Sequence, residues 1–337
     1  MDIMARQALS YYDIVAKTAE NLHLHGTFKI TDHENQNFFL KIYGIKDDSD
    51  IVPGERVYHT YEQIQLESEI LLLLSDSALK TAAPTKNRDG DFVTTLGPDS
   101  DGEPMFATIT SFIDGVAKKH TETPTTEEAY IAGAAAARLH LESKARLLPL
   151  AAKRPHKRQG YMRKIQKRLS RGIEIGTLTE AQYEMSVECC EAVIECMDRL
   201  DLDMENNVGL VHTDIQNSNI IYGQNQVTLV DFSRSVYSYY LYDLAEMCLH
   251  SDFGGSSPEL QKAILRGYHS VKPLDEYGFF AMQTFFAVFI LTLMALCIES
   301  EKNAWLDHVL KWFTDEVHPG LVSGKGYLDP SLFEDIL

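Results

Sequence analysis

The hydrophobic pattern of the chain changes near residue 112, and this change restricts the folds that it can adopt. Residues 27–31 and 38–43 are short runs of aromatic and β-branched residues on either side of a polar turn, which is typical of a β-hairpin. Residues 61–75 carry apolar positions largely on one side of a helix, and residues 105–113 return to strand character. These patterns predict a small α+β unit at the start of the chain.

The rest of the chain is mainly helical in pattern. Thr125 has Glu128 three positions later, a spacing in which each side chain caps a backbone N–H group of the first helical turn. Helical periodicity continues through residues 161–171 and 179–200. We therefore expect a helical unit to follow the smaller α+β unit.

Length and composition agree with two folded parts. The chain has 337 residues, more than one hydrophobic core usually serves, and 45% of them are hydrophobic, which excludes a disordered protein. We expect an α+β fold with a small antiparallel-sheet lobe in residues 1–112. A larger, mostly helical lobe should occupy residues 113–337.

The chain is strongly acidic, with a formal net charge of -18 at pH 7. A field of this sign repels phosphate groups, so nucleic acid is not an expected partner. The acidity either keeps the protein soluble or concentrates a cationic ligand. Residues 144–171 are basic instead, and they form either a solvated helical face or a surface for an anionic ligand.

The sequence predicts a cytoplasmic protein. Its five cysteines lack the spacing of a zinc site, so we expect reduced thiols. The first residues contain no apolar segment of signal-peptide length. Residues 279–298 are uncharged and long enough to span a bilayer, but their acidic flanks and polar interruptions favour a buried helix over a membrane segment.

The sequence VHTDIQNSN at residues 211–219 carries the main chemical signal. It contains Asp214 and Asn219, and it leads into two short strands, the second of which ends at Asp231. Mg²⁺ in proteins prefers oxygen ligands, usually one or two protein groups together with phosphate oxygens and water. Asn219 and Asp231 are therefore the predicted metal ligands, and Asp214 is the predicted acceptor of a proton from a hydroxyl group.

These residues match the H-x-D-x-x-x-x-N loop and the D-F motif of kinases, and the chain resembles the aminoglycoside phosphotransferase and choline kinase family. The resemblance implies a two-lobed protein-kinase-like fold. It also implies ATP or GTP as the phosphoryl donor, Mg²⁺ as the metal and a small molecule as the acceptor.

Further residues take their expected roles from the same resemblance. Lys41 stands where the family's third-strand lysine holds the nucleotide phosphates, and Glu67 in the next helix stands where its ion-pair partner lies. Ser111 and Ile113 resemble the hinge whose backbone meets the adenine base. The nucleotide-covering loop would lie near residues 18–26.

Two segments with no direct chemical role also resemble elements of the family. Residues 138–140 read Arg-Leu-His, as in the signature of the helix that follows the hinge. Residues 243–245 read Asp-Leu-Ala, as in the element that packs beneath the catalytic loop. For His212 within that loop, the resemblance favours a buried structural support over a proton acceptor.

The sequence departs from the protein-kinase pattern at two places. Gln216 replaces the lysine that protein kinases carry two residues after the catalytic aspartate, which favours a small-molecule acceptor. Ser233 and Arg234 follow the D-F motif in place of a glycine or an acid, which leaves activation-loop switching open.

Several residues keep more than one interpretation. Lys41 can also be a strand lysine reaching solvent, and Glu67 has acidic neighbours that fit an exposed helix face. Glu246, Asp252 and Asp275 either bind amino groups of a cationic acceptor or are surface charges.

The resulting expectation is an ATP- and Mg²⁺-dependent phosphotransferase acting on a hydroxyl of a small, cationic molecule such as an aminoglycoside or an amino alcohol. The alternative is a kinase-like module that binds nucleotide without catalysis. Protein Ser/Thr kinase activity is a third, weaker interpretation because of Gln216.

Overall fold

The computed structural model describes residues 2–22, 26–44, 59–99, 102–119, 122–223, 227–249, 257–298, 304–334 and 336. The chain divides into two compact units. Unit 1 contains Met1–Val116 and Ile221–Ser233, and unit 2 contains Ala117–Ile220 and Arg234–Leu337. The chain thus returns to unit 1 for the short segment that carries Asp231.

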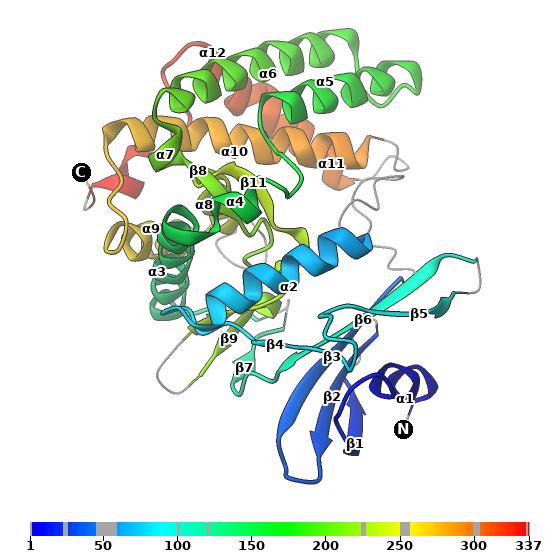
Figure 1. Cartoon of the computed structure of the whole chain (residues 1–337). Coiled ribbons are helices and arrows are strands. Elements are labelled where there is room, and N and C mark those ends of the chain that lie inside the picture. Colours follow the sequence, from blue (N-terminus) through cyan, green and yellow to red (C-terminus); the bar gives the residue numbers. More distant parts are fainter. Residues whose placement is uncertain are drawn as a thin grey trace. The chain divides into compact units, whose positions relative to one another are not determined.

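Unit 1 is built on a six-stranded sheet in the order β1-β2-β3-β6-β4, with β5 paired to β6 (Figure 1). The strands are β1 (Ala16–Asn21), β2 (Thr27–Asp32), β3 (Asn37–Tyr43), β4 (Pro84–Thr85), β5 (Thr94–Pro98) and β6 (Pro104–Ser111). The predicted hairpin is β2 and β3, and its antiparallel register places Lys41 opposite Thr27. On the other side of β3, Lys41 lies opposite Thr108 of β6.

The alternation of side chains along β3 determines on which face of the sheet Lys41 lies. Leu40 and Ile42 are buried in a core that includes residues of α1 (Ile3–Leu9). Successive side chains of a strand point to opposite faces. Tyr43 accordingly packs in a second cluster with Ile64 of α2 (Tyr61–Ser75), and Lys41 lies on that same face.

Unit 2 is mainly helical (Figure 1). Its helices are α3 (Thr126–Glu142), α4 (Leu148–Ala151), α5 (Gln159–Glu174), α6 (Glu180–Leu200), α7 (Met204–Asn207), α8 (Leu241–Leu249), α9 (Pro258–His269), α10 (Glu276–Cys297), α11 (Ala304–Trp312) and α12 (His318–Val322). An antiparallel pair of strands, β8 (Val208–Val211) and β11 (Val236–Tyr239), brackets the catalytic-loop motif. Three short strands, β7 (Val116–Ala117), β9 (Ile220–Tyr222) and β10 (Val227–Leu229), form a small sheet where the chain passes between the units.

Helix α10 contains the apolar segment noted in the sequence. The window Phe280–Cys297 has a mean hydropathy of 2.1 and is long enough to cross a membrane, but 72% of it is buried inside the structure. The helix packs against α5, α6 and α8. Its burial is that of a core helix, as the sequence predicted.

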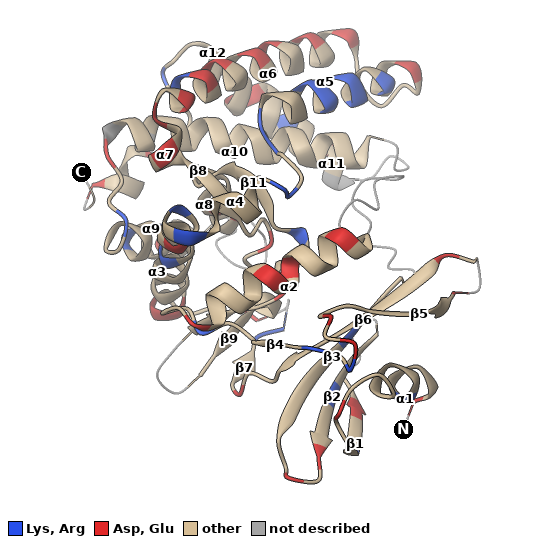
Figure 2. Cartoon of the chain, viewed as in Figure 1, with Lys and Arg blue, Asp and Glu red and all other residues tan. Residues whose placement is uncertain are grey.

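The basic stretch at residues 144–171 is not a single solvated helical face. Arg154 is 2% exposed, and its Nε donates a hydrogen bond to the carbonyl oxygen of Ser235. Arg158 forms an ion pair with Asp201 at 2.6 Å. Only within α5 do the basic residues gather on an exposed face, and there they lie beside the acidic residues of α6 (Figure 2).

The capping box predicted for Thr125 is present. The backbone N–H of Glu128 donates to the Thr125 hydroxyl, and the backbone N–H of Thr125 donates to the Glu128 carboxylate. These bonds satisfy two backbone groups at the start of α3. This start fixes the helix that carries His140 toward the catalytic loop.

Helices α3 and α9 approach each other at two glycines. A β-carbon at Gly133 would overlap the carbonyl oxygen of Ile264, and one at Gly267 would overlap that of Tyr130. Both atoms are backbone, so they cannot move aside without shifting a helix. The glycines therefore set the helix separation that places Tyr268 of α9 beside His140 of α3.

We expect Gly267→Ala to destabilise unit 2 by about 1–3 kcal/mol, because overpacking forces the two helix backbones apart. Gly160→Ala is the matched control, since a β-carbon there meets no atom within 4 Å. Denaturant unfolding should give a lower free energy of unfolding for Gly267→Ala than for Gly160→Ala. Equal stability of the two would show that the helices do not depend on this close approach.

Candidate active site

The catalytic-loop motif leaves β8 at Val211 and turns sharply at Thr213. Thr213 has a φ of 57°, a left-handed conformation that strains a β-branched residue. Such strain persists only where the surrounding structure holds it in place. The turn brings Asp214 and the short helical turn Asn217–Asn219 directly after the strand.

Asp243 of α8 stabilises this strained turn through hydrogen bonds. Its two carboxylate oxygens accept hydrogen bonds from the backbone N–H groups of His212, at 2.9 Å, and Thr213, at 2.7 Å. The Thr213 hydroxyl donates to the carbonyl oxygen of Arg234 at 2.8 Å. His212 and Asp243 are both fully buried. The Asp-Leu-Ala segment therefore supports the catalytic loop through its aspartate.

His140 completes this buried network. Its Nε2 lies 2.9 Å from Asp243, and its Nδ1 lies 2.8 Å from the hydroxyl of Tyr268. Burial lowers the pKa of His140. Burial raises the pKa of Asp243, but the hydrogen bond and charge of His140 outweigh it and hold that pKa below its usual value. A neutral His140 thus donates from Nε2 to an ionised Asp243 and accepts from Tyr268 at Nδ1.

Two amide side chains fix the carboxylate of Asp214. Gln216 Nε2 donates to one oxygen at 2.8 Å, and Asn219 Nδ2 donates to the other at 2.7 Å. Asn219 Nδ2 also donates to the main-chain oxygen of Asp214 at 2.9 Å. The NH₂ group of Asn219 thus faces Asp214, and its amide oxygen, the atom predicted to bind metal, lies 3.4 Å from the Ser218 hydroxyl.

We expect Gln216→Ala to lower kcat by about tenfold or more, because a hydrogen bond to a charged group contributes about 1.5–3 kcal/mol. The loss should appear in kcat, since Gln216 orients the carboxylate that receives the proton. Gln216→Glu offers a comparison that keeps the side-chain length and loses the donor. Steady-state kinetics with unchanged kcat in both variants would contradict this role.

The predicted phosphate-binding lysine lies in unit 1 together with one predicted metal ligand. Lys41 Nζ is 2.8 Å from Asp231 Oδ1, with side-chain exposures of 19% and 38%. Asp231 has a φ of 62°, and Ser233 holds its carboxylate through the hydroxyl at 2.6 Å. Burial lowers the pKa of Lys41, but the charges of Asp231, Tyr43 and Glu67 outweigh it and raise the pKa above its usual value. Lys41 is therefore a permanent cation beside Asp231.

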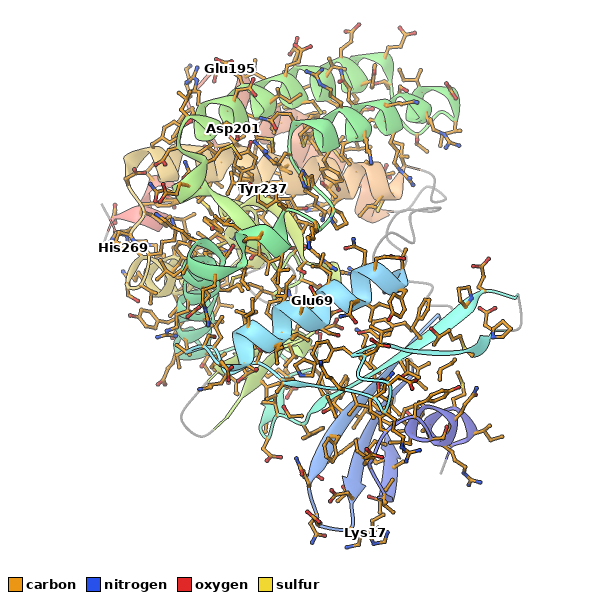
Figure 3. All side chains as sticks on the ribbon, viewed as in Figure 1. Lys17, Glu69, Glu195, Asp201, Tyr237 and His269 are labelled. Atoms are coloured by element: carbon orange, nitrogen blue, oxygen red, sulfur yellow. The ribbon has the colours of Figure 1, made fainter. Side chains whose placement is uncertain are left out.

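Glu67 does not lie on an exposed helix face. It is 4% exposed, and its negative charge acts on Lys41. Its neighbour Glu69, labelled in Figure 3, is half-buried and accepts a hydrogen bond from Gln65. The direct partner of Lys41 in this structure is Asp231, and Glu67 acts as a second negative charge near it.

The predicted hinge residues follow the end of β6. Ser111 donates its backbone N–H to Ala83, and Phe112 donates to Asn37. Ile113 is half-buried and makes no backbone hydrogen bond with any described residue. The predicted nucleotide-covering loop at residues 18–26 begins in β1, and its residues 23–25 lie outside the described part of the chain.

The two predicted metal ligands are oxygen donors that lie in different units, Asn219 in unit 2 and Asp231 in unit 1. Among the described residues, no group of three or more His, Cys, Asp and Glu side chains is arranged to hold a metal ion. The predicted ligands are instead one amide oxygen, on Asn219, and one carboxylate, on Asp231. Mg²⁺ accepts few protein ligands of this kind together with phosphate oxygens and water.

Sequence reasoning missed several contributors to this site. The donor role of Gln216 and the part played by Tyr268 were not predicted. Tyr268 lies 128 positions from His140, so no local pattern connects the two. The strained backbone of Thr213 likewise carries no signal in a single sequence. Of the three carboxylates with two interpretations, Glu246 has a buried Oε2 and is not a surface charge. Asp252 lies outside the described residues, and Asp275 caps the start of α10.

The chain matches one protein-family model, and many solved structures have a similar fold. The sequence matches the model of the phosphotransferase enzyme family over residues 22–281. No curated protein matches it. A microcompartment-associated aminopropanol kinase superposes with a TM-score of 0.72 at 19% identity, covering 96% of this chain and 98% of that one.

Two further solved structures share the fold. An amicoumacin kinase in complex with AMP-PNP, Ca²⁺ and Ami has a TM-score of 0.63 at 18% identity, covering 94% of this chain and 92% of its own. An aminoglycoside phosphotransferase from Alicyclobacillus acidocaldarius has a TM-score of 0.61 at 13% identity, covering 96% of this chain and 95% of its own. The chain therefore belongs to the phosphotransferase enzyme family and has the two-lobed, protein-kinase-like fold that its sequence predicted.

Proposed function

We propose that this small-molecule kinase transfers the terminal phosphoryl group of ATP, or of GTP, to a hydroxyl of an amine-bearing small molecule, with Mg²⁺ as the metal. The observation that carries the proposal is the geometry of Asp214. Its two oxygens are oriented by Gln216 and Asn219, and its backbone leaves a turn that Asp243 holds in place. A carboxylate fixed in this way suits the alignment of an acceptor hydroxyl.

The reaction needs one proton acceptor and charge neutralisation. The acceptor oxygen bonds to the γ-phosphorus, the bond between that phosphorus and the β,γ-bridging oxygen breaks, and the nucleoside diphosphate leaves. Asp214 takes the proton of the hydroxyl. Lys41 offsets negative charge on the phosphates, since its raised pKa keeps it protonated.

The remaining predicted residues would hold the donor. Asn219 and Asp231 would ligate Mg²⁺, which supplies charge stabilisation to the phosphates when bound. The backbone of Ile113, following Ser111 at the end of β6, would meet the adenine base. Glu67 would help to orient Lys41, on which its charge already acts.

The net charge of the chain and its structural neighbours favour an amine-bearing acceptor. A formal charge of -18 attracts cations over a long range. The aminopropanol kinase and the aminoglycoside phosphotransferase that share the fold are named for amine-bearing substrates. Gln216 occupies the place of the protein-kinase lysine, which argues against a protein acceptor. The buried cysteines, which favour the reduced state, fit a cytoplasmic location.

A coupled assay of nucleoside diphosphate release tests the proposal. The panel should contain amino alcohols, amino sugars and hydroxylated amino acids, each paired with an analogue that lacks the hydroxyl. We expect Mg²⁺-dependent turnover of at least one hydroxyl compound and none of its deoxy partner. Turnover that is the same for both partners would exclude phosphoryl transfer to that hydroxyl.

We expect Mg-ATP to stabilise the wild-type protein against heat, because a ligand at 100 times its Kd stabilises by about 2.7 kcal/mol. Lys41→Met should reduce this stabilisation, since it removes the cation that neutralises the phosphates. Lys80→Met, an exposed change in unit 1, is the control. An unchanged nucleotide shift in Lys41→Met would contradict the phosphate role. A normal wild-type shift without turnover of any alcohol would favour the non-catalytic alternative.

A further inference from the structure

Helix α8 presents a second carboxyl group near Asp214. Asp243 and Glu246 lie about one helical turn apart on α8, and the charges of Asp214 and Asp243 both act on Glu246. Glu246 Oε2 is fully buried and has no hydrogen-bond partner among the described residues. A buried carboxyl oxygen without a donor is unfavourable. A ligand that brings a donor to this position removes that penalty.

The ionisation of Glu246 also favours a cationic ligand. Burial is the main cause that raises its pKa well above the usual value, and the charges of Asp214 and Asp243 raise it further. Lys157 and Arg234 act in the opposite direction without cancelling the shift. An ammonium group next to Glu246 would stabilise the ionised carboxylate and form the missing hydrogen bond.

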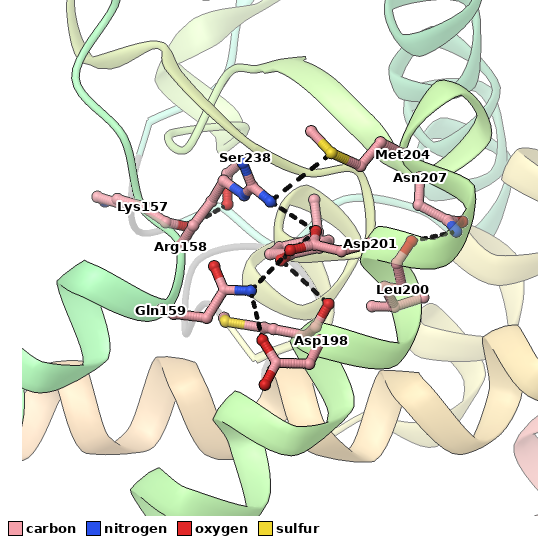
Figure 4. A network of polar contacts seen from close by, with 11 residues as sticks. Lys157, Arg158, Gln159, Asp198, Leu200, Asp201, Met204, Asn207 and Ser238 are labelled. Atoms are coloured by element: carbon pink, nitrogen blue, oxygen red, sulfur yellow. Dashed lines mark hydrogen bonds and ion pairs between the residues drawn. The ribbon is translucent and has the colours of Figure 1, made fainter.

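Lys157, whose charge acts on Glu246, has an anchored backbone. Its backbone N–H donates to Tyr237 at 3.2 Å, and its carbonyl oxygen accepts from the Ser238 hydroxyl at 2.5 Å. The adjacent Arg158 is anchored to Asp201 (Figure 4). The backbone of Lys157 is therefore fixed on β11.

That side chain lies near two aromatic rings, Tyr242 on α8 and Tyr161 on α5. Lys157 Nζ is 4.9 Å from the ring centre of Tyr242 and 5.6 Å from that of Tyr161. It also donates a hydrogen bond to the Tyr242 hydroxyl at 3.3 Å. Tyr242 precedes Asp243 on α8, so the Lys157 side chain contacts the helix that carries Glu246.

The surroundings of Asp214 in unit 2 thus carry both signs of charge. Lys157 and Arg234 would repel an acceptor that is only cationic, and Asp214 would repel one that is only anionic. A ligand with an ammonium group and an anionic group matches both. We propose, building on the proposed function, that the acceptor is a zwitterionic hydroxy-amino acid whose ammonium binds Glu246 and whose carboxylate binds Lys157.

Matched substrates isolate the carboxylate. L-threonine and 1-amino-2-propanol share the same amine and hydroxyl and differ by one carboxylate, as do L-homoserine and 3-amino-1-propanol, and L-serine and ethanolamine. We expect wild-type kcat/KM to be at least tenfold higher for the amino acid in one or more pairs. Higher or equal values for the amine in every pair would overturn the inference.

Charge-removing variants test the assignment of each group. Lys157→Met should reduce the preference for the amino acid within a pair by about 10–100-fold, whereas Lys167→Met, an exposed change on α5, should keep that preference. Glu246→Gln should raise KM for the amino acid more than for a hydroxy acid without the amine. Equal losses on both members of a pair in Lys157→Met would contradict recognition of a carboxylate.

The outcomes separate this inference from the proposed function. Phosphorylation of amino sugars or amines alone, with no amino acid turned over, would reject the zwitterionic acceptor and keep the kinase. Absence of phosphoryl transfer to every alcohol, in a folded protein that binds Mg-ATP, would reject the proposed function as well.

Discussion

Asp214→Asn should lower kcat by about 10²–10⁴-fold, the usual contribution of general acid–base catalysis. The substitution keeps the size of the side chain and removes its ability to take a proton from the acceptor hydroxyl. Gln216 and Asn219 both donate to this carboxylate, so the amide also disturbs the hydrogen bonds that orient it. We expect KM for the acceptor to change much less than kcat, because the main loss is in the transition state.

Asp307→Asn is a matched control, because Asp307 is exposed on α11 and forms no interaction with a described residue. Its kcat should equal that of the wild type. Thermal melts should show that both variants are folded. If Asp214→Asn kept more than a tenth of the wild-type kcat, Asp214 would not be the proton acceptor.

Asp243→Ala should destabilise the protein by about 3–5 kcal/mol, the usual cost of removing one partner of a buried charged network. The substitution leaves the N–H groups of His212, Thr213 and His140 without their acceptor in a fully buried position. It also removes the hydrogen bond between the Thr213 N–H group and Asp243, which holds Thr213 in its left-handed backbone conformation.

Equilibrium unfolding in denaturant measures this loss, with Asp307→Asn again as the control, expected within about 0.5 kcal/mol of the wild type. Asp243→Asn should fall between the two, because one amide oxygen can still accept. A loss of under 1 kcal/mol in Asp243→Ala would show that the catalytic loop is supported by other contacts.

The fold was predictable where local chemistry determines structure. Residues 61–75 form α2 with the predicted bounds, because the apolar stripe and the polar flanks both act locally. The capping box of Thr125 and the hairpin of β2 and β3 follow from short-range spacing in the same way. The return of Ile221–Ser233 to unit 1 was not predictable, since it depends on contacts between residues far apart in sequence.

For the site as well, local features were predictable from the sequence and contacts between distant residues were not. The H-x-D-x-x-x-x-N spacing indicated Asp214 and Asn219, and the structure shows their side chains in direct contact. The ion pair of Lys41 and Asp231 joins residues 190 positions apart. The placement of Glu246 and Lys157 depends on the packing of α8 against α3, α9 and α10 and on the contact of Lys157 with Tyr242. A single sequence contains no signal for such contacts.

Phosphorus-31 NMR of the reaction tests the central claim most directly. Wild-type protein is mixed with Mg-ATP and an acceptor found in the substrate panel. We predict that the γ-phosphorus signal declines while a phosphomonoester of the acceptor hydroxyl and the diphosphate signals of ADP grow in equal amounts. Growth of inorganic phosphate alone, without an ester, would contradict the transfer that Asp214 is proposed to promote.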